Sequence, residues 1–281
     1  MAERSPYQLT GQENSRIYKD RIEPILLATV QASGHEQPRL IMLGGQPGSG
    51  KTFLLRNPAE EELAREGGAV SIDADEMRTY HPAAESLKSE DDRTAAMHTH
   101  PDAAAWVSQA IDTAIRERCH VVLDGTMGSS KSVMERLKRF EDAGYAIEVR
   151  VLAISHRRSW LNVLRRYEDE KSRRGTGRMT PREVHDEAYV GLVKSLGQLV
   201  SPSDVRLRVY SRDKEIFDSN VSPNRPDAPH VLTAERNRPW TAAEKDTYSD
   251  DVKQLVTRAQ ARDADAATID EYQRLFSARR P

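Results

Sequence analysis

The stretch "LGGQPGSGKT" at residues 43–52 decides the fold, because it has the spacing of a loop that binds phosphate. Gly45, Gly50, Lys51 and Thr52 match the pattern G-x-x-x-x-G-K-[ST], and Gly48 adds a further glycine. In such a loop the backbone N–H groups surround phosphate oxygens, the lysine reaches the β- and γ-phosphates, and the threonine hydroxyl binds Mg²⁺. We therefore predict that ATP binds eight consecutive residues: Gly45, Gln46, Pro47, Gly48, Ser49, Gly50, Lys51 and Thr52.

Strand and helix patterns alternate on both sides of this loop. Short apolar runs predict strands over 39–45, 69–73, 120–124, 145–155, 204–213 and 215–220. Helical spacing predicts helices over 10–31, 51–68, 100–119, 130–144, 157–174 and 181–200, with a bend or break near Pro24 and near Pro58. Because such alternation requires crossover connections, we predict an α/β fold with a mostly parallel sheet flanked by helices.

The chain divides into three segments. Residues 1–36 form an N-terminal helical segment, and residues 37–222 form a core with an arginine-rich helical lid around 156–200. A Pro-rich break, "SPNRPDAPH", then precedes a polar C-terminal extension over 223–281, whose pattern is helical. We expect one large core with appended helices rather than two full domains.

Composition argues against several classes of partner. The 42 basic and 44 acidic residues nearly cancel, giving a net charge of -2 and no basic excess for nucleic acid or an anionic membrane. The single cysteine, Cys119, excludes an intramolecular disulfide, and no Cys/His cluster has zinc spacing. No signal peptide or membrane-spanning run is visible. We expect a cytoplasmic protein that binds neither nucleic acid nor a membrane.

The phosphate loop occurs in guanine-nucleotide switches, in molecular motors and in small-molecule kinases. The remaining polar residues indicate which of these classes the chain fits. No asparagine precedes a lysine, so the base clamp Asn-Lys-x-Asp of guanine switches is absent, and the chain is neither long nor basic like a motor. A small-molecule kinase needs a base near the acceptor hydroxyl, positive charge on the transferred phosphoryl group, and a cover that excludes water.

Three aspartates follow predicted strands and could supply the base and the metal ligand. Asp73 and Asp75 come out of one strand in "SIDADEMRTYHP", and Asp124 ends another. One carboxylate can serve Mg²⁺, for which we favour Asp73 with Thr52, while another takes the proton of the acceptor. The alternatives are a helix cap before "EMRTY" and an Asp-Gly turn at residues 124–125.

The positive charge comes from eight arginines between Arg157 and Arg182, in and around a Gly-containing linker between two helices. Guanidinium groups on a hinged segment can close over phosphates, although most of these arginines must be solvated. His81, His156 and His185 are better explained by packing or surface positions than by metal binding. Trp160, Leu164 and Tyr167 have the spacing of a core stripe.

These residues together resemble a family, the zeta toxins of bacterial toxin-antitoxin systems. "GGQPGSGKT", "IDADEMRTYHP", "LDGT", "RRYE" and "GRMTPREVHD" are similar to its elements in order and spacing, from about Tyr7 to Asp218. The resemblance implies a P-loop kinase that phosphorylates the sugar 3'-hydroxyl of UDP-N-acetylglucosamine, with a small helical antitoxin as partner. It implies Asp75 as the general base, Lys51, Arg166 and Arg178 on the phosphates, and Asp124 and Thr126 as further substrate contacts.

Three positions depart from the family pattern. Ser108 stands where counting back from Asp124 places a glutamate, Gly128 where the family has an arginine, and Asp124 where glutamate is common. Related effectors phosphorylate NAD, so NAD or another nucleotide metabolite is an alternative acceptor. A nucleotide-dependent binding module without phosphoryl transfer is the alternative from another class.

Overall fold

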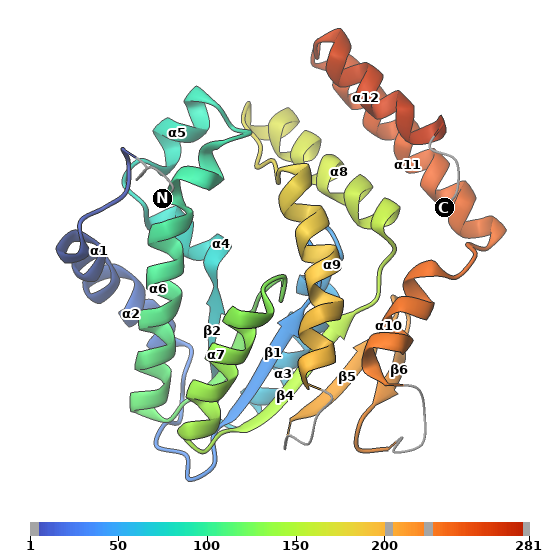
Figure 1. The fold of residues 1–281 in the computed structure, drawn as a ribbon. Helices are drawn as coiled ribbons and strands as arrows, with labels where there is room; N and C mark the ends of the chain where they lie inside the picture. Colours follow the sequence, from blue (N-terminus) through green and yellow to red (C-terminus); the bar gives the residue numbers. More distant parts are fainter. Residues whose placement is uncertain (1–5, 200–204, 222–226, 278–281) are drawn as a thin grey trace.

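The fold, seen in a computed structural model, is an α/β sheet whose helices lie on both faces (Figure 1). The structure describes residues 6–199, 205–221 and 227–277, so the ends of the chain and parts of the expected Pro-rich break lie outside it. Among the described residues, no helix combines the length and the apolar character needed to cross a membrane.

Six strands form one sheet in the order β2-β3-β1-β4-β5-β6. They are β1 Arg39–Gly44, β2 Ala69–Asp73, β3 His120–Asp124, β4 Ala146–Leu152, β5 Arg206–Tyr210 and β6 Glu215–Asp218. The first five run parallel, and β6 pairs antiparallel with β5 at the edge. The predicted mostly parallel sheet is confirmed.

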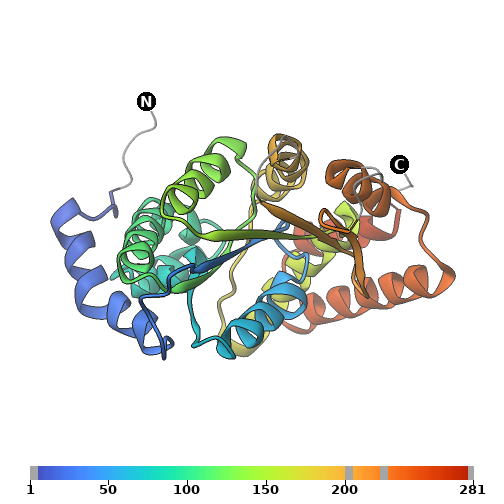
Figure 2. The ribbon, with the colours of Figure 1, turned by 90° about the horizontal axis from the view of Figure 1, so that it is seen from below.

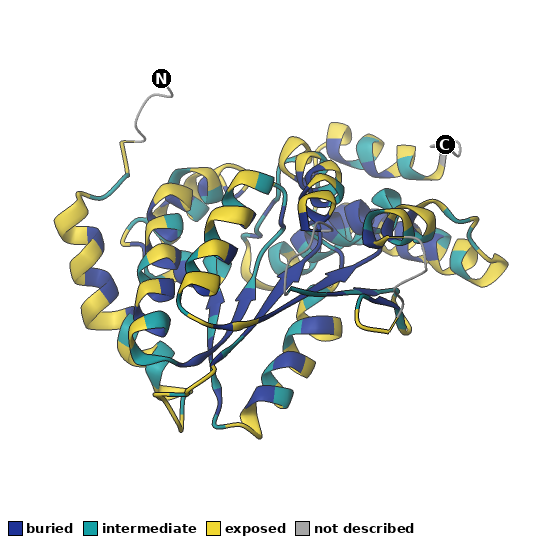
Figure 3. Ribbon diagram, turned by 60° about the horizontal axis from the view of Figure 1, so that its bottom comes forward, coloured by how far each residue is buried: buried dark blue, intermediate teal, exposed yellow. Residues whose placement is uncertain are grey.

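Alternating residues of the central strand β1 enter different cores. Leu40 and Met42 join a large core, while Ile41 and Leu43 join a smaller one on the opposite face. Figure 2 shows α7 and α9 on one side of the sheet and α3 on the other. Burial on both faces explains why β1 is a continuous apolar run, and the central strands are buried along their length (Figure 3).

The helices before the lid are more numerous than the sequence predicted. They are α1 Gly11–Ile17, η1 Tyr18–Ile22, α2 Glu23–Ala28, η2 Thr52–Arg56, α3 Asn57–Ala64, α4 Ala74–Met77, η3 Arg78–Tyr80, α5 Ala84–Glu90, α6 Ala95–Glu117 and α7 Ser130–Asp142. The short helices between residues 74 and 90 were not predicted, since they span too few turns for clear periodicity. The expected helix start at residue 100 was wrong, because α6 begins at Ala95 and includes Pro101.

The two proline positions show how a helix continues past this residue. Pro24 and Pro58 each follow a π-helical turn, η1 and η2, and each lies in the first turn of an α-helix. Proline cannot donate to the preceding turn and its ring crowds a carbonyl there, so a widened turn precedes it. Neither proline ends its helix, so the break expected near Pro58 takes the form of a change in helical type.

The C-terminal helices pack against the rest of the chain. After α8 His156–Arg174 and α9 Arg182–Leu199 come α10 Ala228–Asn237, α11 Ala242–Ala261 and α12 Ala266–Ser277. Ala228 and Leu232 of α10 belong to the large core. The helices α11 and α12 form a separate core with Trp160, Leu164 and Tyr167 of α8, as the core stripe predicted. The boundary at residue 223 stays a prediction.

A buried carboxylate fixes α8 to α11 and α12. Glu168 of α8 is fully buried and accepts hydrogen bonds from Arg262 Nε at 2.6 Å and from the Tyr272 hydroxyl at 2.7 Å. Two ion pairs, from Arg158 and Arg165 to Asp251 of α11, lie along the same interface. The helix that carries the expected lid arginines is therefore supported from behind by α11 and α12.

Candidate active site

The phosphate loop lies between β1 and η2, at the carboxyl edge of the sheet, with α8 resting on it. Gly48 has φ +74°, and a Cβ there would come within 2.1 Å of the Ser159 carbonyl oxygen. Asn162 of α8 donates from Nδ2 to the Gly48 carbonyl at 2.9 Å. A side chain at position 48 would push α8 away, so this glycine allows α8 to pack against the loop.

The loop has polar groups ready for phosphate. Lys51 Nζ donates to the Gly45 carbonyl at 2.8 Å and lies 3.8 Å from Asp124 Oδ1. The buried Ser49 hydroxyl has no hydrogen-bond partner among the described residues. A buried hydroxyl without a partner costs free energy, which a phosphate oxygen would recover. Thr52 is exposed at the start of the following helix. These groups fit a nucleoside triphosphate.

Asp73 and Asp124 end adjacent parallel strands and are paired in register. Asp73 is the N-cap of α4: its Oδ1 accepts from the Asp75 backbone N–H at 2.7 Å, and Oδ2 accepts from Arg56 Nη1 at 3.0 Å. The cap is thus Asp73 rather than Asp75, which leaves the Asp75 carboxylate free of that task.

Crowding of carboxylates at this edge raises two pKa values. Burial and the charges of Asp75 and Asp124 raise the pKa of Asp73 to about 6. Burial, outweighing the attraction of Lys51, also raises the pKa of Asp124. Carboxylates that resist ionisation beside one another suit a bound cation, which would relieve their repulsion. The Asp73 carboxylate therefore fits Mg²⁺, and Thr52, at the end of the phosphate-loop motif, is the second ligand that the sequence predicts.

Asp75 lies among arginines. Its carboxylate accepts from Arg78 Nη1 on one oxygen, and Arg178 Nη1 lies 2.8 Å from the other. Burial acts to raise its pKa, but the charges of Arg178, Arg78, Arg166 and Lys51 outweigh burial and lower it. The side chain stays 43% exposed, as an acceptor site requires. Asp75 is ionised at neutral pH and can accept a proton.

Arg178, one of the arginines of the expected lid, is held by the turn that follows α8. Asp92, between α5 and α6, accepts from the Gly177 backbone N–H at 2.9 Å, from the Tyr167 hydroxyl at 2.9 Å and from Lys171 Nζ at 2.7 Å. Arg178 follows directly, and its own backbone N–H donates to Glu170 at 2.8 Å. This anchoring directs the Arg178 side chain toward Asp75.

Comparison with known proteins fits this arrangement. The model of the family described as "Zeta toxin" matches residues 26–222. This chain belongs to the zeta toxin family. Members are kinase-like toxins, so the resemblance seen in the sequence and the general class of chemistry are confirmed.

Individual relatives agree with the family. The chain is 28% identical over 223 residues to Toxin PezT of Streptococcus pneumoniae, covering 78% of this chain and 86% of the relative. A solved structure from the PezAT toxin-antitoxin system has a TM-score of 0.74 at 23% identity, covering 89% and 98% of the two chains. The structure of AvrRxo1-ORF1:-ORF2 with ATP has a TM-score of 0.56 at 12% identity, covering 95% and 88%. These likenesses confirm the predicted P-loop kinase fold.

The structure adds site residues that the sequence interpretation missed. Arg78, three residues after Asp75 and so on the same helical face, was overlooked, although that spacing was visible. Arg56, one turn after Thr52, pairs with Asp73 at 3.0 Å. His100 of α6 lies 3.2 Å from Arg78 Nη2. No local signal marks His100, because only the packing of α6 brings it to the site.

Two of the three positions that depart from the zeta toxin pattern, Gly128 and Ser108, have different surroundings. Thr126 Oγ1 accepts from the Gly128 backbone N–H at 3.3 Å. Gly128 touches α9 so closely that a Cβ on Gly191 would lie 1.8 Å from the Gly128 carbonyl oxygen. A Cβ on Gly128 itself would lie 3.1 Å from Ala188 Cα of α9, so a larger residue at position 128 would be crowded. Ser108 accepts from Arg139 Nη1 at 3.3 Å and lines a cavity of about 230 Å³ between α6 and α7.

Asp73→Asn should stabilise the ligand-free protein at pH 7.5. An acid whose folded pKa is raised to about 6 disfavours folding while ionised, and this cost disappears as the pH falls through 6 toward its unfolded pKa. The gain at pH 7.5 should be roughly 1 to 3 kcal/mol and should vanish near pH 4. Urea unfolding at both pH values measures it. Asp91→Asn is the control and should destabilise the protein at pH 7.5. Hydrogen bonds from Thr94 and Arg93 lower the pKa of Asp91, so its ionised form stabilises the fold.

Proposed function

We propose that this protein is an ATP-dependent kinase that transfers the γ-phosphate to the 3'-hydroxyl of UDP-N-acetylglucosamine. The observation that carries the proposal is the position of Asp75: an ionised, accessible carboxylate between the phosphate loop and the arginines of the lid. A nucleotide-dependent binding module would have no use for that arrangement.

The chain's own residues account for the transfer. The acceptor hydroxyl gives its proton to Asp75 as its oxygen bonds to the γ-phosphorus, and the bond from that phosphorus to the leaving ADP oxygen breaks. Lys51, Arg166 and Arg178 surround Asp75 closely enough to lower its pKa, so they are also near the phosphate that develops charge. As α8 rests on the loop, its arginines would exclude water from the triphosphate.

Residues 45–52 would hold ATP, and Thr52 and Asp73 would hold Mg²⁺. A bound Mg²⁺ would neutralise part of the charge of the phosphates. Asp73 would have to be ionised to bind it, so protonation of Asp73 near pH 6 opposes metal binding. Asp124 and Thr126 would contact the acceptor beside Lys51.

The cavity between α6 and α7 supports an acceptor that carries phosphate. Arg136 lines it without an ion-pair partner among the described residues, while Arg139 beside it pairs with Asp112 at 2.5 Å. Burial and the charge of Arg139 lower the pKa of Arg136. Burial lowers the pKa of His100, and the charges of Arg78 and Arg136 lower it further. His100 in turn contacts Arg78, which lies next to Asp75. An uncompensated guanidinium at this place suits the diphosphate of a nucleotide.

Arg136→Met should raise the KM for the acceptor about tenfold with little change in kcat, because it removes a contact made equally before and during transfer. Initial rates at saturating ATP measure both constants. Lys138→Met is the matched control on α7, since Lys138 is exposed and pairs only with Asp142. An unchanged acceptor KM would contradict this use of the cavity.

A second acceptor is favoured by the contact at Gly128. Gly128 packs closely against α9 and supplies no guanidinium where the family has an arginine, so the contacts available to the acceptor differ from the family pattern. NAD or another nucleotide metabolite carries the same diphosphate and would satisfy Arg136 equally.

The test is incubation of the protein with ATP and Mg²⁺ against UDP-N-acetylglucosamine, related nucleotide sugars and NAD, with mass spectrometry of the products. One added phosphate on a nucleotide sugar supports the proposal. Phosphorylation of NAD alone would mean that NAD, rather than a nucleotide sugar, is the acceptor. ATP binding without transfer to any of them would favour the binding module.

We also propose that a small antitoxin protein binds this chain in the cytoplasm, where ATP is available. Support comes from membership of the family and from the PezAT toxin-antitoxin system to which one structural relative belongs. The N-terminal helices suit such a contact: Trp106 Nε1 of α6 donates to the Asn14 carbonyl at 2.9 Å, while Ile25 on α2 stays 56% exposed. Copurification with the cognate antitoxin checks this directly.

A further inference from the structure

Arg236 of α10 is a buried cation next to the phosphate loop. It is 4% exposed, donates from Nη2 to Gln46 Oε1 at 2.7 Å and from Nη1 to the Tyr189 carbonyl at 2.8 Å, and lies 4.1 Å from the centre of the Tyr189 ring. Its Nε has no hydrogen-bond partner, and no described carboxylate pairs with it. Burial lowers its pKa to about 10, so it remains charged at neutral pH.

This arrangement is costly unless it serves a ligand. Burying a charge without a counter-ion opposes folding, and stacking on Tyr189 offsets only part of that cost. The group that Arg236 contacts, Gln46, is the second residue of the phosphate loop. The nearest anion that the site is built to receive is therefore a phosphate.

Arg236 fixes the orientation of Gln46. Because a guanidinium can only donate, the Gln46 oxygen must face it and the Gln46 amide nitrogen must face away. That nitrogen donates to the Ile154 carbonyl at 2.8 Å and to Ser159 Oγ at 3.0 Å. Gln46 is fully buried, so the three contacts hold the loop between the segment after β4, α8 and α10.

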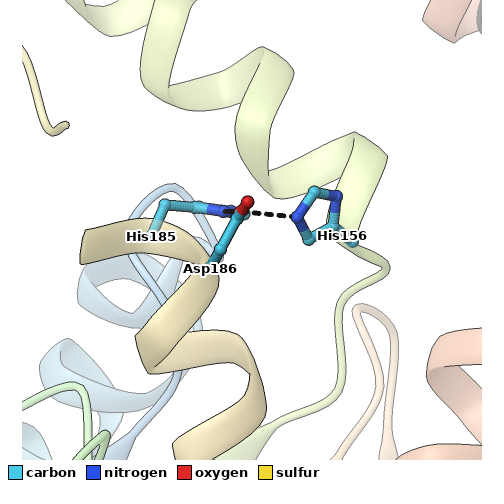
Figure 4. Close-up of side chains that lie close together, drawn as sticks. All are labelled: His156, His185 and Asp186. Atoms are coloured by element: carbon cyan, nitrogen blue, oxygen red, sulfur yellow. Dashed lines mark hydrogen bonds and ion pairs between the residues drawn. The ribbon is translucent and has the colours of Figure 1, made fainter. Parts of the chain in front are cut away.

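The network continues from Ser159 into a histidine cluster. Ser159 Oγ lies 2.9 Å from His185 Nε2, and Asp186 Oδ1 lies 2.8 Å from His185 Nδ1 and 2.6 Å from His156 Nε2 (Figure 4). Arg182 Nε donates to both Asp186 oxygens, so the cluster is satisfied without a metal ion. Ser159 is fully buried, which excludes a role as a nucleophile. The cluster instead secures α8 and α9 around Gln46.

We propose that Arg236 is a positioning residue for the nucleotide site and acts through Gln46 on the phosphate loop. The inference rests on the proposed ATP site. It adds a contact from outside the region that the zeta toxin model matches, because that region ends at residue 222 and α10 follows it. The C-terminal segment thus supports the nucleotide site through Gln46.

The test compares Arg236→Met with Arg238→Met in the full chain. Arg238 is partly exposed and pairs with Glu235 and Glu244 in the same segment, away from the loop. Arg236→Met should raise the Kd for a non-hydrolysable ATP analogue with Mg²⁺, and the KM for ATP, about tenfold, leaving the acceptor KM unchanged. Arg238→Met should match the wild type. Arg236→Lys keeps the charge and should recover part of the affinity for ATP. If Arg236→Met does not fold, Arg236→Lys replaces it in the comparison with the wild type.

A double-mutant cycle tests the route through Gln46. In a Gln46→Met background, Arg236→Met should change the KM for ATP by less than about twofold, because the partner of Arg236 is already absent. Additive effects would overturn the proposal, as would wild-type affinity in Arg236→Met. Failure of the wild type to bind the analogue would instead overturn the proposed ATP site itself.

Discussion

Asp75→Asn should reduce kcat for phosphoryl transfer by about a thousandfold or more and leave ATP binding intact. Asparagine has nearly the same shape but cannot accept the proton of the acceptor hydroxyl. Arg78 and Arg178, which now contact the Asp75 carboxylate, would keep their charge and be free to attract phosphate. The affinity for ATP should therefore be equal or higher. Rates with a saturating acceptor and calorimetry with a non-hydrolysable ATP analogue measure the two effects.

Glu76→Gln is the matched control for this variant. Glu76 is the next residue, is 60% exposed and pairs with Arg56 rather than with the lid. It should keep wild-type transfer. Residual transfer in Asp75→Asn within tenfold of the wild type would mean that another group takes the proton. Loss of ATP binding would mean that Asp75 supports the structure of the site instead.

Arg178→Met should lower kcat by about a thousandfold, because it removes a guanidinium from the charge that develops during transfer. It should also change the pH profile. Arg178 is the strongest of the neighbouring charges that lower the pKa of Asp75. Without it this pKa rises, so the acid limb of kcat/KM should move to higher pH.

The shift of the acid limb separates a direct role from a structural one. A misfolded lid would lower the rate at every pH without moving the limb. Arg173→Met is the control within the lid, since Arg173 is 75% exposed and pairs with Asp169 on the same helix. If Arg178→Met kept the wild-type profile, the contact between Arg178 and Asp75 would have no part in the reaction.

The features that could be predicted from the sequence depend on local spacing and on one rule of topology. The phosphate loop is continuous in the chain. Because parallel strands end at the same edge, the aspartates after β2 and β3 had to lie near the loop. Asp73, Asp75 and Asp124 do meet there, although the sequence could not tell that Asp73 caps α4 while Asp75 faces the lid.

The rest depends on contacts between distant residues. Three such contacts shape the site: Asp92 accepts from Gly177, Gln46 accepts from Arg236, and Gly128 packs against Gly191. The two residues of each pair are far apart in the chain, so no sequence motif contains both. The polar extension had a helical pattern but gave no sign that it supports α8. Such contacts follow from how helices pack over the sheet, which the spacing of one segment cannot specify.

The support of α8 by α11 and α12 has a consequence for the order in which the protein matures. During synthesis the loop, the base and the lid arginines are made before Arg262 and Tyr272, which hold Glu168. A growing chain thus contains the reactive groups well before their alignment is secured. We expect the nascent chain to lack kinase activity until residue 272 has been made and has folded against α8. An inhibitor could bind the chain during that interval.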